Sequence, residues 1–284
     1  MSSVMRICLW GLVALILVAV LLFGMSASFG GKISFTGVTY SDARKYEAGG
    51  TRLPADTQIN AVHIDWIAGE INVRVTEGDQ FAFSESANRD LKEQEQLHYL
   101  VQNGKLTIRY CRSGRNPLAN IPAKTLEVEI PRSAIITELD ISNVSSDVKV
   151  DGAGSFIREI DIENVSGHVT VENASAKTLE METVSGKLEA KGAFEDIKAE
   201  SVSSALSFVL DEMPIKFEVE TIGGGVEITL PENRGFTATL DSVSGSIKCS
   251  FAEVRNRTAR YGDGSARLHV ETVSGSVVIE MGGW

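Results

Sequence analysis

The sequence predicts an all-β protein, a parallel β-solenoid of about eight coils of ~20 residues behind one N-terminal transmembrane helix. Three observations predict it. A short motif recurs along the chain with a period near twenty, apolar and polar residues alternate within each copy, and an uninterrupted apolar run opens the chain. The central residues of seven copies are Val144, Val165, Val184, Val202, Ile222, Val243 and Val273.

The first element, residues 1–30, is predicted to be a membrane anchor or a signal peptide. Residues 7–25 contain no charge and are long enough to span a bilayer core of ~30 Å. Arg6 favours a cytoplasmic N-terminus, so we expect a single-pass protein of the cell membrane whose C-terminal domain is extracytoplasmic. Ser26 and Ser28 could belong to a cleavage site, in which case the domain is secreted.

The second element, residues 31–137, is predicted to be an irregular β entry and cap. It holds one further repeat copy, VHIDWIAGEINV, which starts at Val62. Asn103-Gly104 predicts a hairpin, because a type I′ turn needs positive φ at both central residues, and residues 125–130 predict another strand. Whether the copy with Asp65 and Trp66 stacks in register with the others is left open by the sequence.

The third element, residues 138–284, is predicted to be the regular solenoid. Each copy reads as strand, corner, strand and turn, and we expect the copies to stack in sequence order. Five apolar columns are expected to form the core, including the central Val or Ile, so that Val184 should be buried. The insertion before the last copy, with Arg255, Arg257, Arg260 and Arg267, is expected to be a solvated loop.

Composition and motifs exclude several function classes. The formal net charge of −11, with no stripe of Lys or Arg, argues against nucleic-acid binding. Cys249 falls in a core column and Cys111 should point away from the core, so we expect no disulfide. No G-x-S-x-G motif occurs, and we expect no catalytic residue and no cofactor. Four histidines are expected to lie apart on the surface, His63 and His269 being at opposite ends of one column: His63, His98, His168 and His269.

One outward column is acidic in seven of the eight copies. It either keeps an exposed strand face soluble or forms a ladder that binds cations, including Ca²⁺ weakly, or cationic peptides. Mutual repulsion between stacked carboxylates should raise the pKa of the inner members. Six members of this ladder are expected to occupy consecutive rungs: Glu163, Glu182, Glu200, Glu220, Asp241 and Glu271.

The repeated VSG corners, the VEIPRSA segment before the regular coils and the YGDGSARLHVETVSGSVVIE ending resemble the bacterial putative-adhesin family, membrane-anchored β-solenoid domains of unknown function. The resemblance implies a cell-surface or envelope-associated protein, linked in some members to envelope stress, and implies no catalytic residues. We therefore expect a non-enzymatic envelope interaction or scaffold module, displayed on a membrane tether, whose partner is an envelope polymer, a cationic peptide or a membrane protein. The alternatives are an envelope-stress sensing subunit that acts through a membrane partner and a polysaccharide-active β-helix enzyme.

Overall fold

The computed structural model describes residues 33–34, 37–38, 40–114, 122–232 and 234–282. The apolar run at 7–25 and the possible cleavage site lie outside the described residues. Within the described part of the chain, the helices present are too short or too polar to cross a membrane.

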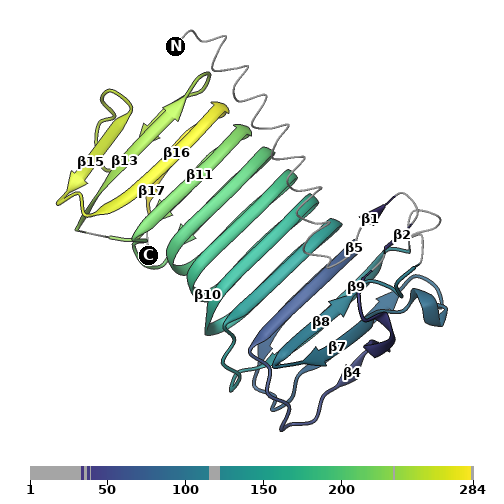
Figure 1. Cartoon of the computed structure of the whole chain (residues 1–284). Coiled ribbons are helices and arrows are strands. Elements are labelled where there is room, and N and C mark those ends of the chain that lie inside the picture. The colour runs from purple at the N-terminus through teal and green to yellow at the C-terminus, as the bar shows by residue number, and fades with distance from the viewer. Residues whose placement is uncertain (1–32, 35–36, 39, 115–121, 233, 283–284) are drawn as a thin grey trace.

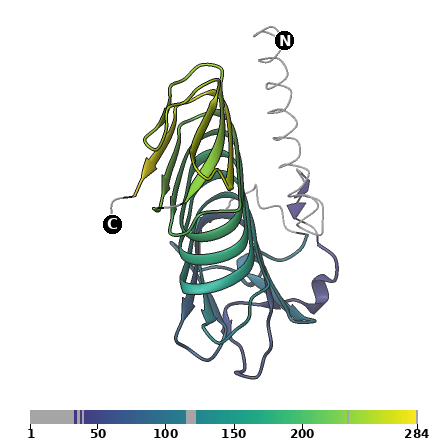
Figure 2. The ribbon, with the colours of Figure 1, turned by 90° about the vertical axis from the view of Figure 1, so that its left-hand side faces the viewer.

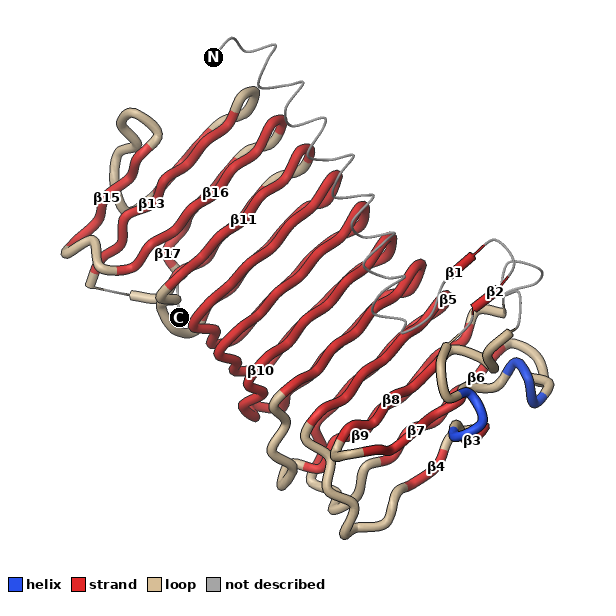
Figure 3. The backbone as a smooth tube through the Cα atoms, viewed as in Figure 1, coloured by secondary structure: helices blue, strands red, loops and turns tan. Residues whose placement is uncertain are grey.

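The repeat copies stack as parallel rungs along an elongated body (Figures 1 and 3). The rungs begin with β5 (Ala61–Thr76) and continue through β10 (Glu138–Leu210), a strand that runs without interruption through four copies. β5 pairs with β10 in register, with His63 opposite Asp140 and Trp66 opposite Asn143. The first copy therefore joins the stack in register. The first half of every copy builds one sheet, here called the first sheet, and the half after the corner builds the second sheet (Figure 2).

The C-terminal rungs do not follow the order of the sequence. β16 (Ala266–Ser274), the last copy, pairs on one side with β11 (Lys216–Gly223) and on the other with β13 (Gly235–Ser242). In the second sheet β17 (Val277–Met281) lies between β12 (Val226–Leu230) and β14 (Ile247–Cys249). The expected sequence-order stacking is therefore wrong for the last two copies.

Close contacts between the corner glycines show the same order of the last rungs. A Cβ atom on Gly275 would lie 1.8 Å from the carbonyl oxygen of Gly224, and one on Gly245 would lie 1.9 Å from that of Gly275. Only glycine permits such a close approach of successive backbones, which explains the small residues at the corners.

The insertion before the last copy closes the C-terminal end of the stack. β15 (Thr258–Gly262) pairs antiparallel with the outer edge of β13, so part of the expected loop is an edge strand, whereas the four arginines are exposed as expected. The ring of Phe236 on β13 lies 5.3 Å from that of Phe251 and 6.0 Å from that of Tyr261. These aromatic rings anchor the insertion on the end of the core.

The N-terminal end is closed by strands that do not belong to the repeats. β8 (Lys105–Arg109) pairs parallel with the first half of β5, and β9 (Lys124–Pro131) pairs with the second half. The predicted hairpin at Asn103-Gly104 is confirmed, since β7 (His98–Gln102) and β8 are antiparallel and both turn residues have positive φ. The remaining elements of this end are β1 (Ile33–Ser34), β2 (Gly37–Val38), η1 (Ala43–Lys45), β3 (Glu47–Ala48), β4 (Thr51–Arg52), β6 (Ala82–Ala87), η2 (Glu93–Glu95) and β7 (His98–Gln102).

Four of the five predicted core columns are buried, as in Leu139, Ile141, Val148 and Val150. The fifth is not. Val184 is half-buried like most of its equivalents, Val243 is 37% exposed, and only Ile67 in the first copy is buried. The residue directly before the central Val or Ile points inward in its place, because the alternation of the first strand continues as far as this residue. It is polar and buried in most copies: Asn143, Asn164, Thr183, Ser201, Thr221 and Thr272.

This inward polar column is held by the backbone of the corner. The Asn143 side chain accepts a hydrogen bond from the Ser146 N–H at 3.1 Å, and the Thr183 hydroxyl donates to the Ser185 carbonyl at 3.2 Å. Asn164 and Thr221 donate in the same way to the carbonyls of Gly167 and Gly223, whereas the buried hydroxyls of Ser201 and Thr272 have no hydrogen-bond partner among the described residues. At four of the six corners a small polar residue thus bonds backbone groups that the tight corner turns toward the core, and the neighbouring Val is displaced outward. This is why the prediction that Val184 is buried is wrong.

Both cysteines in the described residues are free thiols. Cys249 is half-buried in β14, whereas Cys111 is 2% exposed, contrary to the expected outward orientation. Burial raises the pKa of the Cys111 thiol to about 11.

Candidate functional site

The predicted acidic ladder lies on the outward side of the first sheet. Its members alternate with core residues, as Glu182 does with Met181, and they are half-buried because each side chain packs against its neighbours on adjacent rungs. Strand pairing places Glu271 between Glu220 and Asp241. The ladder therefore runs, from the N-terminal end, through Glu163, Glu182, Glu200, Glu220, Glu271 and Asp241.

A second outward column runs beside the ladder and was missed by the sequence analysis. It lies two residues earlier in each copy and is acidic at Asp140, Asp161, Glu180 and Glu218. The signal in the sequence is a triplet of an acidic, an apolar and an acidic residue. It occurs in three copies, as DIE at 161–163, EME at 180–182 and EVE at 218–220. We call the ladder together with these four residues the acidic face.

Basic side chains interrupt the acidic face at its C-terminal half. The Lys198 ammonium lies 2.6 Å from a carboxylate oxygen of Glu180, 2.8 Å from one of Glu200 and 3.6 Å from one of Glu182. At the last rung, Arg257 lies 2.8 Å from Asp241. Both of these basic residues thus lie between the rung of Lys198 and the C-terminal end of the stack. The rung that carries Asp161 and Glu163 has no basic residue in either column.

The pKa values of these carboxyl groups reflect that imbalance. Burial, followed by the charges of neighbouring carboxylates, raises the pKa of Asp161 to about 8 and that of Glu163 to about 7. The pKa values of Glu182 and Glu220 are raised by the same two causes. The expected rise in pKa is thus found for Glu163, Glu182 and Glu220, but partial burial contributes more to it than the repulsion from which it was predicted.

The first two rungs depart from the ladder. Asp65 is buried and forms an ion pair with Arg109, and Ser142 replaces the acidic residue of the second copy and is also buried. Beside Asp65, Trp66 donates a hydrogen bond to the Lys124 carbonyl at 3.3 Å. The first rung is therefore occupied by the cap and does not contribute to the open acidic face.

The four histidines lie apart, as expected, but not all on the surface. His63 and His269 belong to one column and lie at its two ends, His63 opposite Asp140 and His269 opposite Glu218. His168 is exposed, whereas His98 is 6% exposed in the cap, and burial lowers its pKa. His63 lies next to two carboxylates, a contact that sequence reasoning did not foresee.

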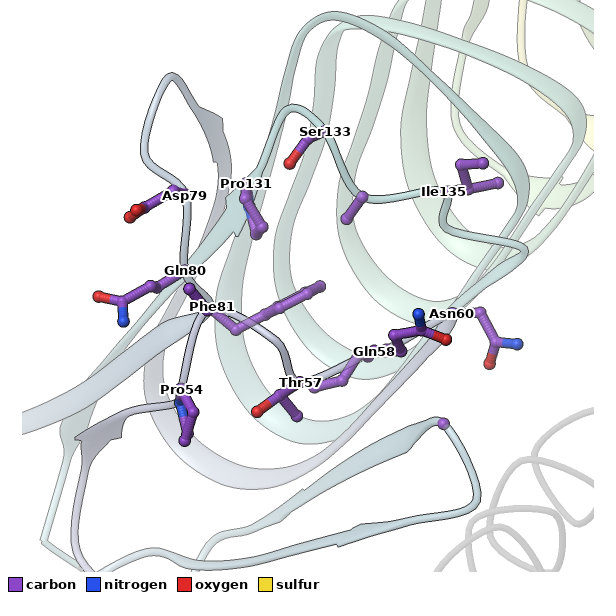
Figure 4. Close-up of a pocket in the computed structure, with 14 residues that line it drawn as sticks. Pro54, Thr57, Gln58, Asn60, Asp79, Gln80, Phe81, Pro131, Ser133 and Ile135 are labelled. Carbon is purple, nitrogen blue, oxygen red and sulfur yellow. The ribbon is translucent and has the colours of Figure 1, made fainter.

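A cavity of about 520 Å³ lies where the cap meets the first rungs (Figure 4). It is lined by loop residues and by strand ends, among them Thr57, Asn60, Phe81 and Ile135. Asp79 is its only charged lining residue. Thr57 and Ser133 place hydroxyl groups in its wall, but no histidine, lysine or arginine is among its lining residues to activate them, so the cavity shows no nucleophile–base pair.

The family model of Toastrack DUF4097 matches residues 59–193 and 157–280. The chain belongs to this family. Toastrack DUF4097 is not a known enzyme family, and the resemblance to putative adhesins expected from the VSG corners is confirmed. No curated protein matches the chain.

Several solved structures are similar to this toastrack protein at low identity. One is a putative adhesin from Bacteroides fragilis, at 12% identity and a TM-score of 0.46, with 82% of this chain and 97% of that chain covered. Another is a putative lipid binding protein from Parabacteroides distasonis, at 15% identity and a TM-score of 0.45, with 82% and 96% covered. A third is a putative cell adhesion protein from Clostridium sporogenes, at 12% identity and a TM-score of 0.33, with 84% and 100% covered.

Proposed function

We propose that this toastrack protein is a non-enzymatic interaction module of the cell envelope, held outside the cytoplasm by residues 7–25, and that its acidic face binds cationic groups of an envelope polymer or protein. The observation that carries the proposal is the stacking of outward carboxylates on adjacent rungs in two adjoining columns, with no basic residue on the rung of Asp161 and Glu163. Burial and mutual repulsion raise the pKa of both groups. Carboxylates that are partly buried beside one another without a countercharge are stabilised by any cation that binds the folded protein.

The partner that suits this face is elongated and carries several positive charges. Rungs repeat at ~4.8 Å, so carboxylates are presented at regular steps along the long axis of the molecule. A linear polycation can contact several rungs at once, whereas a single monovalent ion contacts one. Binding of this kind weakens steeply as salt screens the charges.

The direct test is the affinity of purified full-length protein for an oligolysine peptide at increasing salt concentration. Substitution of Glu163, Glu182 and Glu220 by Gln should weaken binding at least about tenfold, a loss of ~1.4 kcal/mol. The control replaces three carboxylates on the outward side of the second sheet by Gln, which changes the net charge equally: Glu172, Glu189 and Glu227. Equal affinities of the two triple variants would contradict the assignment to the acidic face.

The topology requires its own test, independent of any ligand. A reporter enzyme fused to the C-terminus should be active outside the cytoplasm and should stay with the membrane after a salt wash. N-terminal sequencing of the mature protein distinguishes a retained anchor from a cleaved signal peptide. Reporter activity confined to the cytoplasm would contradict the proposed location.

A further inference from the structure

A mixed cluster of one imidazole and two carboxylates lies at the junction of the first two rungs. His63 projects outward from β5, and Glu138 and Asp140 project outward from the first strand of β10. Parallel pairing puts Asp140 directly opposite His63, and Glu138 lies two residues earlier on the same side. The potential ligand atoms of the three residues lie within 4.8 Å of one another.

Both ring nitrogens of His63 face a carboxylate. Nδ1 lies 3.1 Å from Oδ2 of Asp140, and Nε2 is in hydrogen-bond contact with Oε1 of Glu138. A neutral imidazole carries one N–H, so it can donate to only one of these carboxylates and turns a lone pair toward the other. The side chains are 17%, 43% and 24% exposed, in the order His63, Glu138, Asp140, so the cluster is sheltered but accessible to an ion from solvent.

We propose that His63 and Asp140, supported by Glu138, bind a divalent transition-metal ion, with Zn²⁺ the best-suited case. A metal bonded to a nitrogen and an oxygen at ~2.0–2.2 Å requires these two atoms to be about 3 Å apart, which is the separation of Nδ1 and Oδ2. Nε2–H then donates to Glu138, the arrangement in which a carboxylate fixes the tautomer of a metal-binding histidine. An imidazole ligand favours Zn²⁺ over the hard ions Ca²⁺ and Mg²⁺.

The surroundings provide a further carboxylate. Asp161 lies on the next rung of the same column, and Asp140 is one of the groups that act on it electrostatically. Lys105 and Arg109 on β8 also act on Asp140 and oppose excess negative charge. Since His63 lies on β5 and Asp140 on β10, a bound ion would join the first rung to the second.

The test is titration of metal-free full-length protein with Zn²⁺, followed by calorimetry and by thermal unfolding, with Mg²⁺ at matched ionic strength as the reference. We expect one Zn²⁺ per chain at this site and a melting temperature that rises with Zn²⁺ but not with Mg²⁺. His63→Gln should remove the increment and weaken Zn²⁺ binding at least about tenfold. His269→Gln is the matched control, because His269 lies on the same column and makes an ion-pair contact with one carboxylate, Glu271, at 3.0 Å from Nε2.

Co²⁺ gives a second readout that does not depend on stability. A Co²⁺ ion bound through nitrogen and oxygen should give a visible absorption band in the wild type and in His269→Gln, and lose it in His63→Gln and in Asp140→Asn. Equal Zn²⁺ binding by wild type and His63→Gln, or equal effects of Zn²⁺ and Mg²⁺ on melting, would overturn the proposal. The triple Gln variant of the acidic face retains all three residues, so loss of oligolysine binding and loss of Zn²⁺ binding can be told apart.

Discussion

Replacement of Lys124 by Met should cost more stability than replacement of any other lysine in the described residues. Its side chain is fully buried, and its ammonium lies 2.6 Å from a carboxylate oxygen of Glu85, whose side chain is 7% exposed. The ammonium also donates to the carbonyl oxygens of Glu95 and Tyr110, and lies 4.6 Å from the ring centre of Trp66. Three acceptors and an aromatic face replace the water that this cation has lost.

The magnitude follows from what Met leaves behind. Glu85 would remain buried with its charge uncompensated, and removal of one partner from a buried ion pair costs about 3–5 kcal/mol. For a chain of this size that loss corresponds to a fall in melting temperature of roughly 6–20 °C. The double variant Lys124→Met/Glu85→Gln should recover a large part of the loss, because it removes the unpaired charge.

Thermal and chemical unfolding of the three variants measures this directly. Lys149→Met is the control, because Lys149 makes an ion pair of the same length with Glu172, at 2.6 Å, with a side chain that is 55% exposed. That exposed pair should contribute less than about 1 kcal/mol. If Lys124→Met melts within about 2 °C of the wild type, the buried pair does not hold the cap on the first rung.

Three further predictions concern the repeats. Gly186→Ala should destabilise the fold by at least about 2 kcal/mol in urea unfolding, because φ is +133° and the added Cβ would lie 1.9 Å from the Gly167 carbonyl oxygen; wild-type stability would contradict the close stacking of the corners. Val184→Asp should be tolerated, whereas Leu188→Asp, at a core position that is 1% exposed, should prevent folding or cost several kcal/mol; comparable melting temperatures would refute the corrected column assignment. The raised pKa of Glu163, about 7, means that the folded state retains a proton after the unfolded chain has lost it. Stability should therefore fall as pH rises from about 4.5 to about 7, and Glu163→Gln should flatten this part of the measured pH profile, whereas an unchanged slope would show that Glu163 does not titrate as inferred.

The period of the repeats and the hairpin could be predicted because both depend on residues close in sequence. Asn103-Gly104 supplies a turn with positive φ by itself, and the alternation around Leu139 identifies one face of a strand without knowledge of its neighbours. Val184 shows where this reasoning fails. A column that is apolar in every copy need not be buried, because the corner displaces the side chain outward and favours a hydrogen-bonding residue, Thr183, inside.

Long-range contacts account for most of what the sequence did not predict. Lys124 is surrounded by groups from β6, from η2 and from Tyr110, which follows β8, and nothing in its own segment distinguishes it from a solvated lysine. The contact of His63 with Asp140 requires that the first copy stack in register across the whole cap segment. The acidic ladder could be identified from the sequence because it repeats in each copy. The contacts of its carboxylates with basic residues could not, because they depend on which rungs lie next to one another.

The order of the last rungs has a physical reason that concerns the ends of the stack. Copies with nearly equal sequence can pair with one another in more than one order, so the connections decide which order forms. The last copy pairs between β11 and β13, so β13 becomes the last repeat strand of the first sheet. β15 pairs antiparallel with its free edge. At the opposite end β7 pairs antiparallel with β8. At the C-terminal end of the first sheet the outermost strand, β15, thus runs against the repeats and offers no parallel, in-register template for the first rung of another copy. At the other end the outermost strand is β3, which has only two residues and pairs antiparallel with β7. Stacks of near-identical coils can join end to end, so we expect the insertion to oppose such joining at the C-terminal end of the first sheet while it leaves the acidic face open.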